Sequence, residues 1–234
     1  MIKIYFLLIL SSISLSIFAK SSALGGSILY IKGSASSGPI NGQFTPIVKG
    51  KIIPYGEVIK TEMQSFVLLQ LGEAIKVKIN ADSELKIKKP EVNDQGGKKR
   101  NIFLRLGSAF VNVEPSKMKN NGDSFKLRTK TVSMGVRGTK FFAAISKKRK
   151  KSSKDDVWMC VSEGKVVVNK LGDSKEVLVK KGEGIVVKEG KAISKPMPLP
   201  WTSNLNWSMN LTENMENKLS IEQAYYDLLD IDYD

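Results

Sequence analysis

The stretch SFVLLQLGEAIKVKINADSELKIKK, Ser65–Lys89, alternates apolar and polar residues on both sides of Gly72. The alternating apolar positions are Val67, Leu69, Leu71, Ile75, Val77, Ile79, Leu85 and Ile87. Lysines fill the intervening positions of the later runs, at Lys76, Lys78, Lys86 and Lys88. Because successive side chains of a strand point to opposite faces, this pattern predicts strands with one face on a core and the lysines in water. The glycine between two such runs predicts a tight turn.

The same layout recurs along the middle of the chain. Further alternating runs that turn at a glycine are IFLRLGSAFVNVE (Ile102–Glu114), VWMCVSEGKVVVNK (Val157–Lys170) and EVLVKKGEGIVVKEG (Glu176–Gly190). Short strands with regularly spaced turn signals predict an all-β sandwich or roll of mainly antiparallel strands. We therefore expect residues 24–195 to form one all-β domain.

The N-terminus, residues 1–23, has the pattern of a secretory signal peptide: Lys3, an apolar run and then small residues. The run is short for a bilayer span, which needs about 20 residues. Cleavage is expected after Ala19 or Ala23, with an uncleaved anchor as the alternative. No cysteine lies nearby for lipoprotein acylation. The sequence thus predicts a periplasmic or envelope-associated protein without an integral span after cleavage.

The C-terminal segment, residues 196–234, differs from the body. It begins with a proline-rich connector that carries Trp201 and Trp207, which either dock on the domain or contact a partner. Ser220 and Gln223 have the spacing of a capping box and open a predicted short amphipathic helix with acidic ends. The helix either packs on the domain or is presented to a partner.

Charge is distributed unevenly along the chain. The formal net charge is +14, yet residues 196–234 hold seven acids and one lysine. A basic body is compatible with an anionic surface or polyanion partner, and equally with a soluble lysine-rich surface. The most concentrated basic run consists of Lys147, Lys148, Arg149, Lys150 and Lys151. It is either a partner-contact patch or a solvated hairpin tip. Lysines outnumber arginines and no aromatic residues interleave with them, so we expect no nucleic-acid partner.

Candidate chemistry is sparse. The sequence has no histidine, which excludes Ser-His and Cys-His nucleophile systems and histidine metal sites. The single cysteine, Cys160, is expected to be a small core residue. We expect no catalytic residue, cofactor, nucleotide or metal.

The stretch TVSMGVRGTKFF, Thr131–Phe142, lacks the glycine spacing of either nucleotide-binding loop. Its residues Gly135, Val136, Arg137, Gly138, Thr139 and Phe141 are expected to form a structural junction between strands. Both glycines would adopt backbone conformations that a Cβ resists. Arg137 would be buried and clamp carbonyls or a carboxylate, with ligand contact as the alternative.

The order of these elements resembles the FecR domain of bacterial envelope proteins over roughly residues 45–190. The similar segments are GEVIKTEMQSFVLLQLGEAIKVKINADSELKI (Gly56–Ile87), IFLRLGSAFVNVE, SFKLRTKTVSMGVRGTKFFAAI (Ser124–Ile145), VWMCVSEGKVVVN and VLVKKGEGIVV. The resemblance implies an extracytoplasmic all-β domain that acts through contacts. In the family's best-known members it belongs to a sigma-factor regulator that senses an outer-membrane transporter.

The expected function is therefore a non-catalytic exported binding or signalling module for an envelope protein or glycan. The alternatives are a stand-alone regulator in sigma-factor and TonB-transporter signalling, and a binder of polyanions or anionic envelope surfaces.

Overall fold

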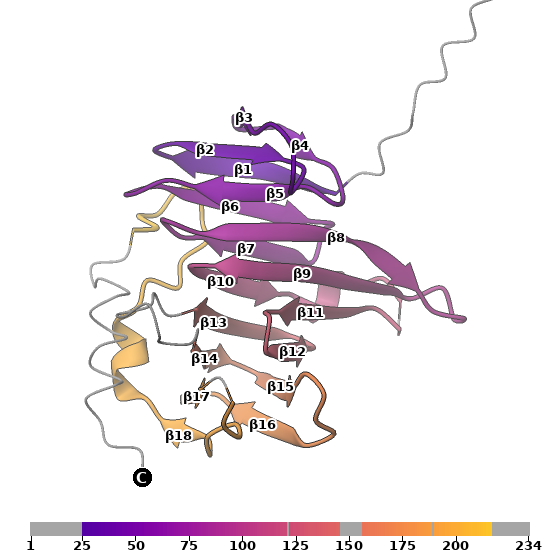
Figure 1. The fold of residues 1–234 in the computed structure, drawn as a ribbon, viewed down its shortest axis with the longest axis vertical. Helices are drawn as coiled ribbons and strands as arrows, with labels where there is room; N and C mark the ends of the chain where they lie inside the picture. The colour runs from indigo at the N-terminus through magenta and orange to yellow at the C-terminus, as the bar shows by residue number, and fades with distance from the viewer. Residues whose placement is uncertain (1–24, 121, 146–155, 189, 217–234) are drawn as a thin grey trace, which may run out of the picture.

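The computed structural model describes residues 25–120, 122–145, 156–188 and 190–216 (Figure 1). Their regular structure is almost entirely β, in two nine-stranded sheets. The predicted all-β class is confirmed. The expected signal peptide, the basic run Lys147–Lys151 and the expected C-terminal helix lie outside the described residues. Within those residues, no helix has the length and apolar character that a bilayer crossing requires.

Sheet A and sheet B are named here by their strands. Sheet A contains β1 (Gly26–Lys32), β4 (Ile52–Ile53), β6 (Phe66–Leu71), β7 (Ile75–Ile79), β10 (Ser108–Val113), β13 (Thr139–Ile145), β14 (Val157–Glu163), β17 (Glu183–Val187) and β18 (Met197–Pro198). Sheet B contains β2 (Ala35–Gly38), β3 (Thr45–Pro46), β5 (Val58–Thr61), β8 (Glu84–Val92), β9 (Lys98–Leu106), β11 (Ser124–Arg128), β12 (Val132–Val136), β15 (Lys165–Lys170) and β16 (Glu176–Lys180). Two short 3-10 helices complete the described elements, η1 (Pro115–Lys117) and η2 (Pro200–Asn204).

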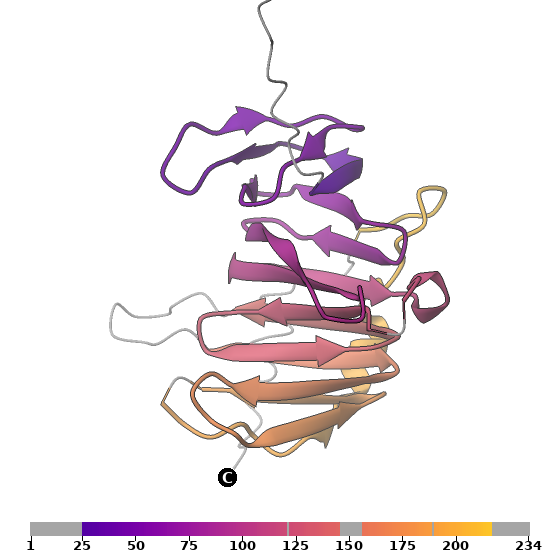
Figure 2. The ribbon, with the colours of Figure 1, turned by 90° about the vertical axis from the view of Figure 1, so that its right-hand side faces the viewer.

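Strands are added to both sheets nearly in chain order. The order in sheet A is β4-β1-β6-β7-β10-β13-β14-β17-β18, and in sheet B it is β3-β2-β5-β8-β9-β11-β12-β15-β16. The chain therefore advances from one end of the sandwich to the other while it passes between the two layers (Figures 1 and 2). Neighbouring strands are antiparallel except β9 and β11, which are parallel.

Glycines stand where the chain reverses or changes layer. Gly72, with φ +60°, joins β6 to β7 within sheet A, as the alternation around it predicts. Gly107, with φ +77°, lies between β9 of sheet B and β10 of sheet A, and a Cβ there would meet Ser83. Left-handed backbone is accessible to glycine at little cost, so these positions permit sharp changes of direction.

The main core lies between the sheets. Its members are the alternating apolar residues of both layers, among them Val67, Val77, Leu85 and Ile102. A second apolar cluster lies on the outer face of sheet A, beneath residues 197–216, which we call the strap. The strap begins at β18 and runs back across sheet A towards β1 (Figure 1).

The strap corrects one expectation. Lys78 was expected in water but is fully buried, because the strap covers the face of β7 from which its side chain projects. Lys86 and Lys88 of sheet B are half-buried and exposed, respectively, on a face that no described segment covers in this way.

Candidate functional site

The GVRGT turn joins the two layers. Gly135 and Val136 end β12, and Thr139 and Phe141 belong to β13. Gly138 has φ +69°, and a Cβ there would lie 2.8 Å from the Pro115 side chain, so this position requires glycine. Gly135 has ordinary strand backbone with room for a Cβ, so the expectation of a special conformation holds for Gly138 alone.

Arg137 is exposed, so the expectation of a buried clamp is wrong. Val136 points into the core, and in extended chain the next side chain points away from it. Arg137 makes no hydrogen bond or ion pair with a described residue. Thr139 holds the junction instead: its buried Oγ1 donates to the carbonyl oxygen of Lys165, 2.9 Å away, which ties β13 to β15.

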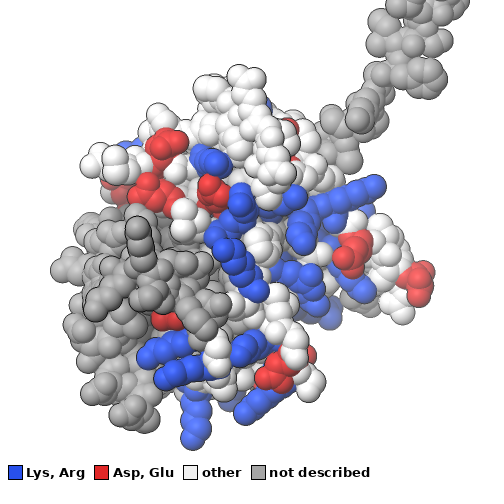
Figure 3. Space-filling view, in the orientation of Figure 1, with Lys and Arg blue, Asp and Glu red and all other residues white. Residues whose placement is uncertain are grey.

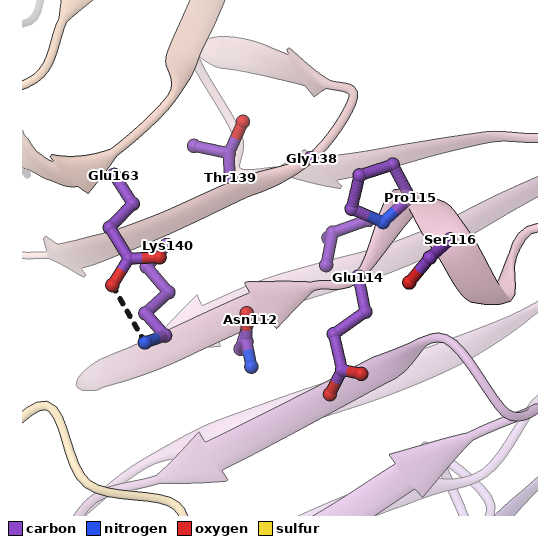
Figure 4. A pocket seen from close by; sticks show the side chains of 9 residues that line it. Asn112, Glu114, Pro115, Ser116, Gly138, Thr139, Lys140 and Glu163 are labelled. Atoms are coloured by element: carbon purple, nitrogen blue, oxygen red, sulfur yellow. Dashed lines mark hydrogen bonds and ion pairs between the residues drawn. The ribbon is translucent and has the colours of Figure 1, made fainter.

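A polar hollow of about 400 Å³ adjoins this turn (Figure 4). Its lining includes Gly138 and Thr139 from the turn, Glu114 just before η1, Lys140 of β13 and Glu163 of β14. Lys140 Nζ lies 2.7 Å from Glu163 Oε1, and Glu114 pairs with a lysine at 2.6 Å. Both carboxylates are thus neutralised by bases. Nowhere in the described ranges do three His, Cys, Asp or Glu side chains gather as a metal site would require.

The outer face of sheet A carries an aromatic row that the strap covers. Phe110, Phe142 and Trp158 come from β10, β13 and β14, with neighbouring ring centroids 4.6 and 4.8 Å apart. Trp207 of the strap packs edge-on against Phe110 at 5.1 Å, and its Nε1 donates to the carbonyl of Thr202. Of the two tryptophans of the connector, Trp207 is therefore docked on the domain, and Trp201 lies in η2.

Lys78 fastens the strap to this row. Its ammonium is fully buried and donates to three main-chain carbonyl oxygens. They belong to Asn206 (2.6 Å), Ser208 (3.3 Å) and Met215 (3.0 Å). The ammonium also lies 4.4 Å from the centroid of the Phe110 ring. Burial lowers the pKa of Lys78 from 10.5 to about 8. The group remains mostly charged at neutral pH and serves as an internal cation around which the strap folds.

Sequence reasoning missed this arrangement, although a signal was present. Lys78 pairs across the sheet with Leu68 on one side and Phe110 on the other. Both are apolar at positions that alternation assigns to solvent. Strands that are apolar on both faces indicate a sheet covered on both sides.

The far end of the strap is held by an ion pair between Lys32 and Glu216 at 2.5 Å.

The outer face of sheet B is basic. Figure 3, which looks onto this side of the sandwich, shows lysine and arginine side chains spread across its middle. Four bases there, which we call the basic face, are Lys86 and Lys88 of β8 and Lys126 and Arg128 of β11. None of the four forms an ion pair with a described residue. The nearby acid Glu84 is already paired with Lys60 at 3.2 Å and with Arg105 at 2.9 Å.

Comparison with known proteins gives a match to a family model and similarity to solved structures. Residues 57–167 match the family model described as FecR protein, a range within the resemblance deduced from the sequence. Two crystal structures of a candidate anti-sigma factor from Parabacteroides distasonis are similar at 20% identity, with TM-scores of 0.46 and 0.45. Each similarity covers 60% of this chain and 59% of that protein. Comparison with curated sequences gives no match.

The family match begins just before β5 and ends in β15, so it contains both the GVRGT turn and the basic face. The strap lies beyond its end. Residues 57–167 therefore form a FecR domain.

Proposed function

We propose that the protein is an exported, non-catalytic FecR-domain module that binds a component of the cell envelope and acts in signalling. The FecR match over residues 57–167 carries this proposal, because it favours regulation through contacts over catalysis. The protein from Parabacteroides distasonis is itself described as an anti-sigma factor, which agrees with such a role but adds no independent weight at this level of similarity.

The chemistry of the described residues supports binding rather than catalysis. Cys160 is fully buried on β14, and burial raises the pKa of its thiol, so the reactive thiolate is suppressed. The ammonium of Lys78 is enclosed by the strap and has no access to a substrate. The carboxylates of the polar hollow are paired with lysines.

Export is proposed from the pattern of residues 1–23. Mass spectrometry of the mature N-terminus, together with cell fractionation, tests it. An intact N-terminus on a protein found in the cytoplasm would contradict export, and with it the proposed location in the cell envelope.

Envelope binding is tested by in-cell crosslinking of the tagged full-length protein, followed by quantitative identification of what is captured. A tagged periplasmic protein of similar net charge serves as the control. Capture of an envelope protein or glycan above the control is expected. Equal recovery from both baits contradicts the proposal.

A second role, regulation of a sigma factor coupled to a TonB-type transporter, is favoured by the family match alone. Deleting the gene should then change a defined set of transcripts under metal limitation. An unchanged transcript profile excludes this second role and leaves the binding function in place.

A further inference from the structure

We infer that the basic face of sheet B is a binding site for an acidic polysaccharide, a chain of sugars that carry carboxylates. This inference rests on the proposed envelope-binding function and names the surface and the ligand class. The sequence pattern placed Lys86 and Lys88 in water but did not predict this face, because its four members come from two different strands.

Charge is the first argument. Lys86, Lys88, Lys126 and Arg128 project from the side of sheet B opposite Leu85, Ile87, Phe125 and Leu127, which are buried in the core. With no carboxylate among the described residues paired to these four bases, their charge is available to an anionic partner. Arg128 adds a specific sign of an absent partner: its Nε is buried and has no hydrogen-bond acceptor. Buried donors in native proteins are nearly always paired.

Register is the second argument, because it places an aromatic ring between two cations. Lys86 is opposite Phe103 on β9, and Phe103 is opposite Arg128 on β11. Two strand spacings separate the cations, about 10 Å. The ring of Phe103 is half-exposed, and the Lys88 ammonium lies 5.7 Å from its centroid. The ring provides an apolar platform for the apolar face of a sugar, with bases around it to bind the sugar's carboxylate.

The neighbouring row extends the surface in the same direction. Lys88 is opposite Asn101, Asn101 is opposite Lys126, and Lys126 is opposite Gly135. A Cβ at Gly135 would come no closer than 3.8 Å to a neighbouring atom, so nothing nearby fills the space above it. Because Gly135 has no side chain, the surface of the face at this position lies close to the backbone. The GVRGT segment thereby contributes to the surface as well as to the turn.

An extended polymer suits this face better than a membrane does. Free bases recur on alternate strands, which matches a ligand with charges at regular intervals. A membrane-binding surface would add large apolar side chains that insert among the bases. Here the ring between Lys86 and Arg128, that of Phe103, is half-buried. We therefore expect anionic vesicles to bind more weakly than the polymer.

The test measures binding of the mature full-length protein to polygalacturonate by isothermal titration calorimetry, with dextran as the uncharged control. The double variant Lys86→Gln/Arg128→Gln should weaken binding about tenfold or more, because hydrogen bonds to charged groups are strong. The matched control is Lys165→Gln/Lys180→Gln, a cross-strand pair on the same face that removes the same charge. It should change the affinity less than about twofold, as expected of distant charges in salt.

Phe103→Ala provides a second readout. It should weaken binding to polygalacturonate while leaving the salt dependence unchanged, because it removes contact and not charge. Thermal unfolding of each variant verifies that the fold is retained.

Three results would overturn the inference: no binding to polygalacturonate, equal weakening by the two double variants, or tighter binding to phosphatidylglycerol vesicles than to the polymer. The proposed function has a separate readout. If Lys86→Gln/Arg128→Gln still captures the same envelope component in cells, that function stands and only the assignment of this face fails.

Discussion

Replacing Lys78 with methionine tests whether the buried ammonium holds the strap. The variant keeps most of the side-chain volume and removes three hydrogen bonds to strap carbonyls. Hydrogen bonds to charged groups contribute roughly 1.5–3 kcal/mol each. Burying the charge opposes them: a pKa lowered from 10.5 to about 8 corresponds to about 3 kcal/mol.

The balance of these terms is a net loss of about 1–5 kcal/mol in the free energy of unfolding. For a chain of this length, a loss of about 3 kcal/mol lowers Tm by roughly 6–12 °C. The loss should be concentrated in the strap, since the core between the sheets does not contact Lys78.

Two measurements check this expectation. Differential scanning calorimetry gives the change in Tm, and hydrogen exchange with mass spectrometry reports protection of residues 197–216. Lys76→Met is the matched control, because Lys76 lies on the same strand and face but is half-exposed. It should change stability by less than about 0.5 kcal/mol. A Lys78→Met protein as stable as the parent, with a protected strap, would refute the reasoning, since it would mean that desolvation outweighs the hydrogen bonds.

The remaining predictions concern pH, the turn and the thiol. Because the pKa of Lys78 is lower in the folded state, the unfolded chain binds more protons between about pH 8 and 10.5, so the contribution of Lys78 to stability should rise across that window. Unfolding in urea at several pH values measures this rise, which should be smaller in Lys78→Met. Gly138→Val should destabilise by at least about 2 kcal/mol through its left-handed backbone and the contact with Pro115, whereas Arg137→Ala should stay within about 0.5 kcal/mol because the side chain is exposed and unpaired. Thermal melts of the two variants compare them directly, and an equal loss in both would restore a structural role for Arg137. Cys160 should react with a maleimide only in denaturant, and labelling of the native protein would contradict its burial.

The sequence predicted the strands because alternation depends only on neighbouring residues. Val67, Val77 and Leu85 all face the core as their spacing requires. Period-two alternation distinguishes the faces of a strand but does not reveal what covers the second face. The expectation that Lys78 lies in water was wrong for that reason. The strap carbonyls that enclose its ammonium lie between 128 and 137 positions further along the chain.

The candidate surface depended on long-range register. The row Lys86–Phe103–Arg128 exists because β11 pairs in parallel with β9, a choice that no local pattern encodes. The expectation that Arg137 is buried was wrong because Val136 faces the core, so the next side chain along the extended backbone points to solvent. The roles expected of the N-terminal segment, the basic run and the acidic helix stay predictions.

The strap also bears on the order in which parts of the protein fold. Apart from β1 and β6, paired strands are at most three strands apart in chain order, so the sandwich resembles a one-dimensional array that can grow as the chain appears. The strap closes that array with contacts of very high sequence separation, to Lys78 of β7 and to Lys32, the last residue of β1. Such contacts form late, because they require loop closure over nearly the whole chain. Until the last twenty described residues arrive, Phe110, Phe142 and Trp158 face outward, and the nascent domain is most vulnerable to aggregation at that stage.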